Sequence, residues 1–277
     1  MRRILAKKIQ DKVCALCAQA NLVLRKDVFG ALESAYAKET NKRAKEILGA
    51  IIANAKIARK ESLAICQDTG LPCVFVEIGQ DIRISGDFKK AINQGVELGY
   101  RRGFLRNSII KDPLLRGRPG YQPIVIHIDV VKGNKLKLTV LPKGFGCENK
   151  TQLKMLKPTA GIAEIKKFIL EVVKSAGPDA CPPYIIGVGI GGTADYACFL
   201  AQKALLRKLN AKRYTLYAKL ESNLLKEINK LNIGPMGLGG KTTALAVNIE
   251  TYPTHIAGLP VAVNISCHAL RSASVVL

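Results

Sequence analysis

Short apolar runs alternate with segments of helical periodicity along the second half of the chain, and this alternation restricts the possible folds. The apolar spacing predicts a helix over 159–176, a strand over 184–190, helices over 193–208 and 214–230, and strands in the runs TALAVNIE and LPVAVNIS. Aromatic residues are only 5% of the 277 residues and Trp is absent, so Leu, Ile, Val and Ala must supply the core. We expect an α/β fold of mixed sheets covered by helices. The chain is expected to form one domain over 1–277, and a boundary between two lobes of this domain is an alternative near 150–158.

The first half of the chain is predicted to open with two or three helices. Residues 4–24 and 28–60 carry apolar side chains at helical spacing, with the basic residues on the outward faces. A strand is expected over 74–78, and a helix over 86–102. These elements add a second group of helices and strands to the alternating ones above.

Two further apolar runs are separated by a short polar link. IVIHIDVV covers 124–131 and KLKLTVL covers 135–141, and the link between them contains Gly-Asn. Such a link supports a tight turn between strands. The pattern therefore predicts a β-hairpin.

The chain is strongly basic, with 43 Lys and Arg against 21 Asp and Glu and a formal net charge of +22. Such a charge attracts anions of every kind, including nucleic acid, phosphates and small dicarboxylates. The basic residues are interleaved with apolar ones in the helical segments, and no aromatic platform for bases accompanies them, which favours solvated helix faces over a nucleic-acid surface. No apolar stretch of membrane-spanning length and no signal-peptide pattern is found, so we expect a soluble, cytoplasmic protein without a membrane partner.

Two glycine-rich motifs resemble nucleotide-binding signatures, but neither fits. PMGLGGKTT has Pro235 where a phosphate-binding loop requires Gly, and an expected strand follows it instead of a helix. Gly187, Gly189 and Gly192 have the spacing of a dinucleotide fingerprint, but the stretch 208–213 lacks the acidic residue that would bind the ribose. The second motif then predicts only a strand-to-helix turn that an anion can approach.

The eight cysteines are too sparse for a disulfide scaffold and are expected to be reduced thiols. Cys14 and Cys17 lie one helical turn apart and are interpreted as packing in a helix seam, while Cys73 and Cys198 have apolar neighbours typical of a core. The other four have loop-like surroundings: Cys66, Cys147, Cys181 and Cys267. Their long spacings match no local zinc or ferredoxin pattern, so the residues alone do not make them metal ligands.

Five motifs, taken together and in order, resemble a known family. They are CQDTG, PKGFGCENK, CPPYIIGVGIGGT, GPMGLGGKTTALAVNIE and THIAGLPVAVNISCHALR. In this order they resemble the α subunit of the iron–sulfur (class I) fumarate hydratase and L-tartrate dehydratase family, over residues ~60–275. The resemblance implies that 1–277 is an iron–sulfur hydro-lyase α-subunit domain.

The resemblance implies a 4Fe-4S cluster with an open iron. Cys66, Cys181 and Cys267 would each bind one iron, and the fourth iron would act as a Lewis acid on the substrate. Asp68 would be the proton-handling carboxylate. His255 matches a family histidine near the reacting centre, as an orienter of Asp68 or a more distant hydrogen-bond donor.

Substrate binding is implied for two side chains and one turn. Gln67 would face the substrate, and Arg106 would clamp one carboxylate with its bidentate fork. Gly144 and Gly146 would offer backbone N–H groups to the other carboxylate. This sequence has Gly-Phe-Gly-Cys where the family has Gly-Gly-Gly-Ser, which leaves both the role of Cys147 and the identity of the substrate open.

The function implied is reversible hydration of fumarate to (S)-malate, a reaction of the tricarboxylic acid cycle, by a chain that needs a smaller β subunit. The chain stops ten residues past Cys267, so we expect an α2β2 assembly whose dicarboxylate site is completed by the partner. The alternative within this chemistry is an L-tartrate dehydratase or related 2-hydroxy diacid dehydratase. The alternative from another class is a basic, non-catalytic nucleic-acid or phosphate-binding protein.

Overall fold

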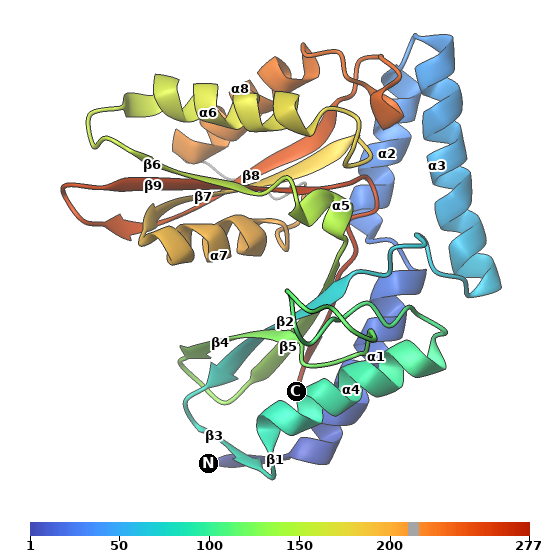
Figure 1. Ribbon diagram of the computed structural model, residues 1–277, viewed down its shortest axis with the longest axis vertical. Helices are drawn as coiled ribbons and strands as arrows, with labels where there is room; N and C mark the ends of the chain where they lie inside the picture. Colours follow the sequence, from blue (N-terminus) through green and yellow to red (C-terminus); the bar gives the residue numbers. More distant parts are fainter. Residues whose placement is uncertain (210–215) are drawn as a thin grey trace. The chain divides into compact units, whose positions relative to one another are not determined.

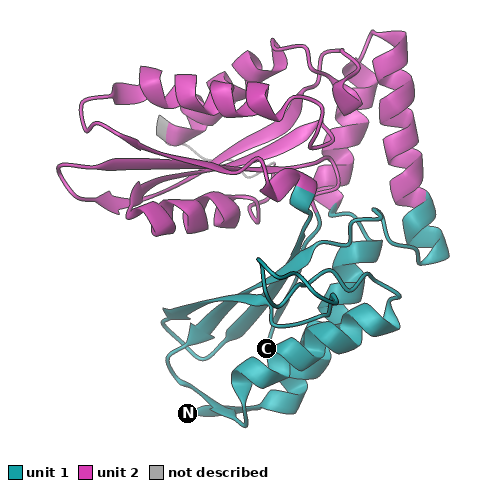
Figure 2. Ribbon diagram, in the orientation of Figure 1, with its two compact units in different colours: residues 1–25, 57–145, 271–277 teal, residues 26–56, 146–270 magenta. Residues whose placement is uncertain are grey.

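A computed structural model describes residues 1–209 and 216–277 and divides them into two compact units (Figure 2). Unit 1 comprises Met1–Arg25, Ile57–Phe145 and Arg271–Leu277, and unit 2 comprises Lys26–Lys56 and Gly146–Leu270. The first two residues of the helix expected over 214–230 lie outside the described residues. Both units combine helices with mixed sheets, which confirms the predicted α/β class (Figure 1).

The main sheet of unit 1 has four strands in the order β10-β5-β2-β4. Their bounds are Leu71–Gly79 for β2, Val125–Val131 for β4, Leu136–Lys143 for β5 and Ala273–Val276 for β10. β2 pairs with β4 in parallel and with β5 in antiparallel orientation. A separate parallel pair is formed by β1 (Arg2–Leu5) and β3 (Ile82–Ser85).

The predicted hairpin over 124–141 is wrong, because β2 lies between its two strands. β2 carries a continuous buried run and takes the centre of the sheet, whereas the largely exposed β4 takes an edge. The link after β4 crosses the end of β2, where Gly79 N–H donates to the Lys135 carbonyl at 2.9 Å. A Cβ at Gly79 would lie 2.2 Å from the Gly133 oxygen, so this crossing requires glycine.

Helices α1 (Ala6–Leu22) and α4 (Phe88–Arg102) pack closely in unit 1. Gly99 of α4 makes this possible, since a Cβ there would lie 2.7 Å from the Cys14 carbonyl oxygen. The interpretation of Cys14 and Cys17 as seam residues is confirmed. Cys17 is fully buried, and this burial raises the pKa of its thiol far above the ordinary value.

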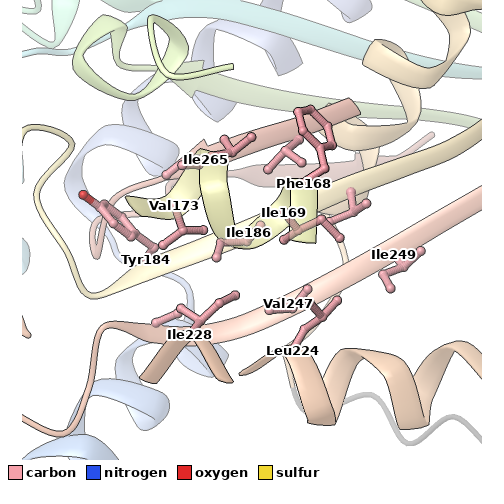
Figure 3. Packing of buried hydrophobic residues seen from close by; sticks show 14 of the residues in the cluster. Phe168, Ile169, Val173, Tyr184, Ile186, Leu224, Ile228, Val247, Ile249 and Ile265 are labelled. Carbon is pink, nitrogen blue, oxygen red and sulfur yellow. The ribbon is translucent and has the colours of Figure 1, made fainter. Parts of the chain in front are cut away.

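Unit 2 is built on a sheet of strand order β6-β9-β7-β8. The strands are β6 Gln152–Leu156, β7 Tyr184–Gly192, β8 Ala244–Thr254 and β9 Leu259–Ser266. The helices that cover them are α6 Gly161–Ala176, α7 Ala194–Ala204 and α8 Leu216–Asn229. α6 and α8 form the larger core with one face of the sheet, including Phe168, Leu224 and Ile186, while α7 covers the other face (Figures 1 and 3).

The glycines of the GxGxxG motif are explained by the packing of α7. A Cβ on Gly187 would lie 2.0 Å from the Ala201 carbonyl oxygen, and one on Gly189 would lie 2.0 Å from that of Ala197. Both glycines lie within β7 and let a helix backbone approach the strand. Their spacing therefore reflects helix–sheet packing.

The two remaining helices of the N-terminal half are α2 (Lys26–Lys38) and α3 (Lys42–Glu61). Their connecting turn carries the buried Glu39, whose carboxylate accepts N–H groups from Thr40 and Lys241. The bond from Lys241 anchors the PMGLGGKTT loop, which contains the short 3-10 turn Pro235–Gly237. The loop leads into the strand β8, as predicted. Among the described residues, no helix is long and apolar enough to span a membrane.

We expect Gly189→Ala to lower the free energy of unfolding by about 1–3 kcal/mol, because the added methyl group meets the backbone of α7. Gly30→Ala is the matched control. Gly30 lies inside α2 with nothing within 4 Å of an added Cβ, so the substitution should stabilise the protein by about 0.5–1 kcal/mol. Urea titration measures both, and equal effects of the two variants would contradict the close approach of α7 to β7.

Candidate active site

The turn that carries Cys66 and Asp68 is fixed at both ends within unit 1. Its beginning is held by Ile65 N–H, which donates to the Asn21 carbonyl at 3.0 Å. Its end is held by the buried Tyr100, whose hydroxyl donates to the Thr69 carbonyl at 2.8 Å. Gly70 has φ +75, and a Cβ there would meet the backbone of Lys143 at 2.7 Å. The turn is therefore a rigid part of unit 1.

The Asp68 carboxylate accepts one backbone N–H on each oxygen. Oδ1 accepts from Gly70 at 3.0 Å, and Oδ2 accepts from Phe145 at 2.9 Å. A Cβ on Gly144 would lie only 3.1 Å from Oδ2, so glycine at this position keeps the approach open. Two donors from segments far apart in sequence thus set the direction of a half-buried carboxylate.

Arg106 is attached to the same turn through its backbone. Its N–H donates to the Thr69 hydroxyl oxygen at 3.0 Å, while the residue itself is exposed. Gln67 is exposed next to Asp68. The structure thus brings together Cys66, Gln67, Asp68 and the backbone of Arg106 in unit 1.

Unit 2 places Cys181 and Cys267 at one end of its sheet. Cys181 precedes β7, Cys267 follows β9, and the antiparallel register pairs Ile185 with Ser266. Both cysteines are partly exposed, and Cys181 has a φ of +55. His268 supports this arrangement, because its backbone N–H and its ring Nδ1 lie 3.3 and 3.1 Å from the Cys181 carbonyl oxygen.

His255 lies at the other end of the same sheet. It follows β8, and the register pairs Thr254 with Gly192, the last residue of β7. A nine-residue strand spans roughly 25–30 Å, so within unit 2 His255 is a strand length from Cys181 and Cys267. The structure does not bring this histidine to the two thiols of its own unit.

Cys147 has surroundings different from those expected. It lies buried in the short helix α5 (Phe145–Glu148), and its Sγ is 3.5 Å from the Ala180 carbonyl oxygen. The prediction of a loop-like setting for this cysteine is therefore wrong, because Cys147 packs with the core of unit 2. Gly146 beside it is exposed, and a Cβ there would meet the Asp179 oxygen only at 3.8 Å.

Sequence reasoning missed three residues that support the Asp68 turn, namely Asn21, Tyr100 and Arg271. All three are buried, and the side chains of Tyr100 and Arg271 bond to the backbone of the turn. Asn21 lies four residues after Cys17, on the same face of the expected helix, and this spacing was the only sequence feature that could have indicated its burial. Nothing in the local sequence distinguishes Arg271 from the many exposed cations.

The comparisons with known proteins identify the class. The family model for fumarate hydratase (Fumerase) matches residues 10–276, so the chain belongs to the fumarate hydratase family and is an enzyme of the hydro-lyase class. The chain is 44% identical over 275 residues, 96% of each chain, to a Methanocaldococcus jannaschii protein named "Putative L(+)-tartrate dehydratase subunit alpha". It is also 29% identical over 269 residues to the L(+)-tartrate dehydratase subunit alpha of Escherichia coli K12, covering 95% of this chain and 89% of that one.

We expect Phe145→Pro to lower turnover at least tenfold, because proline removes the N–H that Asp68 Oδ2 accepts. Residue 145 is the first of α5, a position where proline is tolerated, so the helix itself should survive. Phe145→Ala keeps the N–H and is the matched control. Equal turnover of the two variants, with equal thermal stability, would contradict the role of this bond.

Proposed function

We propose that the chain is the α subunit of an iron–sulfur hydro-lyase that interconverts fumarate and (S)-malate. The observation that supports this most directly is the Asp68 carboxylate, which two backbone donors orient two residues after Cys66. A second candidate substrate is L-tartrate. The names of the two relatives favour it.

The thiols fit the proposed 4Fe-4S cluster. Cysteine thiolates are the usual ligands of such clusters, and Cys66, Cys181 and Cys267 are all partly exposed. Within the described ranges, no group of three or more His, Cys, Asp or Glu side chains could already hold a metal ion, so the ligand set rests on the family motifs that contain these three cysteines. Cys66 belongs to unit 1, whereas Cys181 and Cys267 belong to unit 2, where His268 fixes the backbone at Cys181.

Asp68 is proposed to move the proton. Elimination of water from a 2-hydroxy diacid removes a proton from the carbon next to one carboxylate and the hydroxyl group from the adjacent carbon. Each Asp68 oxygen accepts one N–H and so retains a lone pair for this proton. When bound, the cluster supplies an iron that polarises the leaving hydroxyl as a Lewis acid.

The other residues are proposed to hold the diacid. The exposed guanidinium of Arg106 can bind one carboxylate with two parallel hydrogen bonds, and Gln67 can add a side-chain amide. The Gly144–Gly146 turn is proposed to contact the second carboxylate, although the Phe145 N–H in its centre is already used by Asp68. His255 is exposed, and its role as an orienter of Asp68 or a more distant hydrogen-bond donor stays a prediction.

We propose a partner subunit because the residues named above are too few to bind both carboxylates and to complete the proton transfer. Two carboxylates need cationic or N–H partners, and anti addition of water needs a second proton-handling group across the substrate. The names of both relatives specify a subunit alpha. We therefore propose a smaller β subunit that completes the dicarboxylate site, with an α2β2 assembly.

Replacing a proposed ligand should abolish cluster binding. We expect Cys66→Ser, Cys181→Ser and Cys267→Ser to lose bound iron and sulfide, because serine is a poor iron ligand. Cys14→Ser and Cys73→Ser are the controls, since those residues pack in unit 1. Iron and sulfide analysis after anaerobic reconstitution provides the measurement, and full iron retention in a proposed ligand variant removes that residue from the set.

Asp68→Asn should keep the cluster and lower kcat by roughly 10²–10⁴, the usual loss for a general acid or base. Arg106→Leu should instead raise KM, because it removes a carboxylate clamp. Steady-state kinetics with fumarate, malate and tartrate separate the two effects. Wild-type turnover by Asp68→Asn with normal iron content would assign the proton transfer to another group.

The chain alone should be catalytically incomplete. We expect the reconstituted chain, with its cluster content verified, to turn over none of the three diacids, and the chain co-expressed anaerobically with its β partner to turn over one of them preferentially. That preference decides between fumarate and tartrate. Substantial hydration of fumarate by the chain alone would contradict the two-subunit proposal.

A further inference from the structure

Arg271 is a buried cation in unit 1 that the proposed reaction does not use. Its exposed fraction is 3%, and it lies four residues after Cys267 and just before β10. A guanidinium stays charged at every working pH, and burying a charge is costly unless it is well paired. The position of this charge therefore requires an explanation.

The partners of Arg271 are neutral. Its Nη1 donates to the Asn21 side-chain oxygen at 3.1 Å, and its Nη2 donates to the Asp68 backbone carbonyl at 2.7 Å. Its Nε is buried without a hydrogen-bond partner. The two acceptors, a side-chain amide and a backbone carbonyl, hold the guanidinium next to the turn that carries Asp68. Neither acceptor is charged.

Asn21 and Gly144 complete the arrangement around this cation. Asn21 donates its side-chain amide to the Cys17 carbonyl, and its own carbonyl accepts Ile65 N–H, so it links α1 to the start of the turn. A Cβ on Gly144 would lie 3.1 Å from Asp68 Oδ2 and 3.8 Å from Arg271 Nη2. The Asp68 carboxylate and the Arg271 guanidinium therefore both lie close to Gly144.

We propose that Arg271 is a positioning residue for the hydro-lyase reaction. It fixes the backbone at Asp68, so that the carboxylate meets the N–H groups of both Gly70 and Phe145. The positioning itself is a property of the fold, while its consequence for turnover rests on the proposed function.

Hydrogen exchange of single amides in the full chain, measured by NMR, tests the positioning. We expect Arg271→Met to accelerate exchange of the Gly70 and Phe145 amides at least tenfold, because both amides donate to Asp68. Arg271→Lys should show a smaller acceleration, since an ammonium can replace only part of the fork. The amide of Val275, in the β10–β5 pair, should be unchanged. Arg102→Met, an exposed cation of α4, is the matched control.

Two results would overturn the positioning. One is unchanged exchange of Gly70 and Phe145 in Arg271→Met. The other is an acceleration at Val275 as large as that at Gly70 and Phe145, in both Arg271 variants. This result would show that Arg271 only anchors the C-terminal strand. If Arg271→Met does not fold, Arg271→Lys alone decides between these outcomes.

Kinetics of the anaerobic complex with the β partner test the consequence for turnover. Arg271→Lys should lower kcat about tenfold while KM and iron content stay at wild-type values. A raised KM with unchanged kcat would overturn the positioning role in the reaction. If the exchange result holds but Asp68→Asn retains full turnover, the proposed function fails at Asp68 and the positioning of the turn stands.

Discussion

The Asp68 carboxylate joins two segments of unit 1 that are 77 residues apart, and most of the local structure serves this contact. Gly70 and Phe145 donate to its two oxygens, and Gly144 must lack a side chain for the approach to occur. Because both oxygens are engaged, the carboxylate cannot rotate without losing a charge-assisted hydrogen bond. In the proposed reaction, this carboxylate would accept the proton without first having to be oriented.

The two thiols of unit 2 come together through antiparallel pairing. Cys181 and Cys267 are 86 residues apart in the sequence, but one precedes β7 and the other follows β9, and these strands are antiparallel neighbours. Local zinc and ferredoxin patterns place ligands within a few residues of each other, so they could not reveal this pair. Only the family motifs indicated both cysteines from the sequence.

Periodicity predicted the elements well, whereas pairing and contacts lay beyond it. The runs TALAVNIE and LPVAVNIS form β8 and β9 because they are buried and apolar. The hairpin over 124–141 failed because β2, distant in sequence, is the more apolar strand and takes the place between β4 and β5. β6 was missed because it is short and four of its five residues are exposed, so the polar–apolar alternation of its sequence QLKML does not mark a buried face. Arg271 was missed because burial of a cation depends on tertiary contacts alone.

The proposed 4Fe-4S cluster of this hydro-lyase subunit has one iron without a protein ligand. Mössbauer spectroscopy of the ⁵⁷Fe-reconstituted complex with its β partner, before and after addition of fumarate or tartrate, tests it most directly. We expect one iron site to differ from the other three and its signal alone to shift when the diacid binds. Four iron sites that do not respond to either diacid, in a complex with full cluster content, would contradict the proposed open iron.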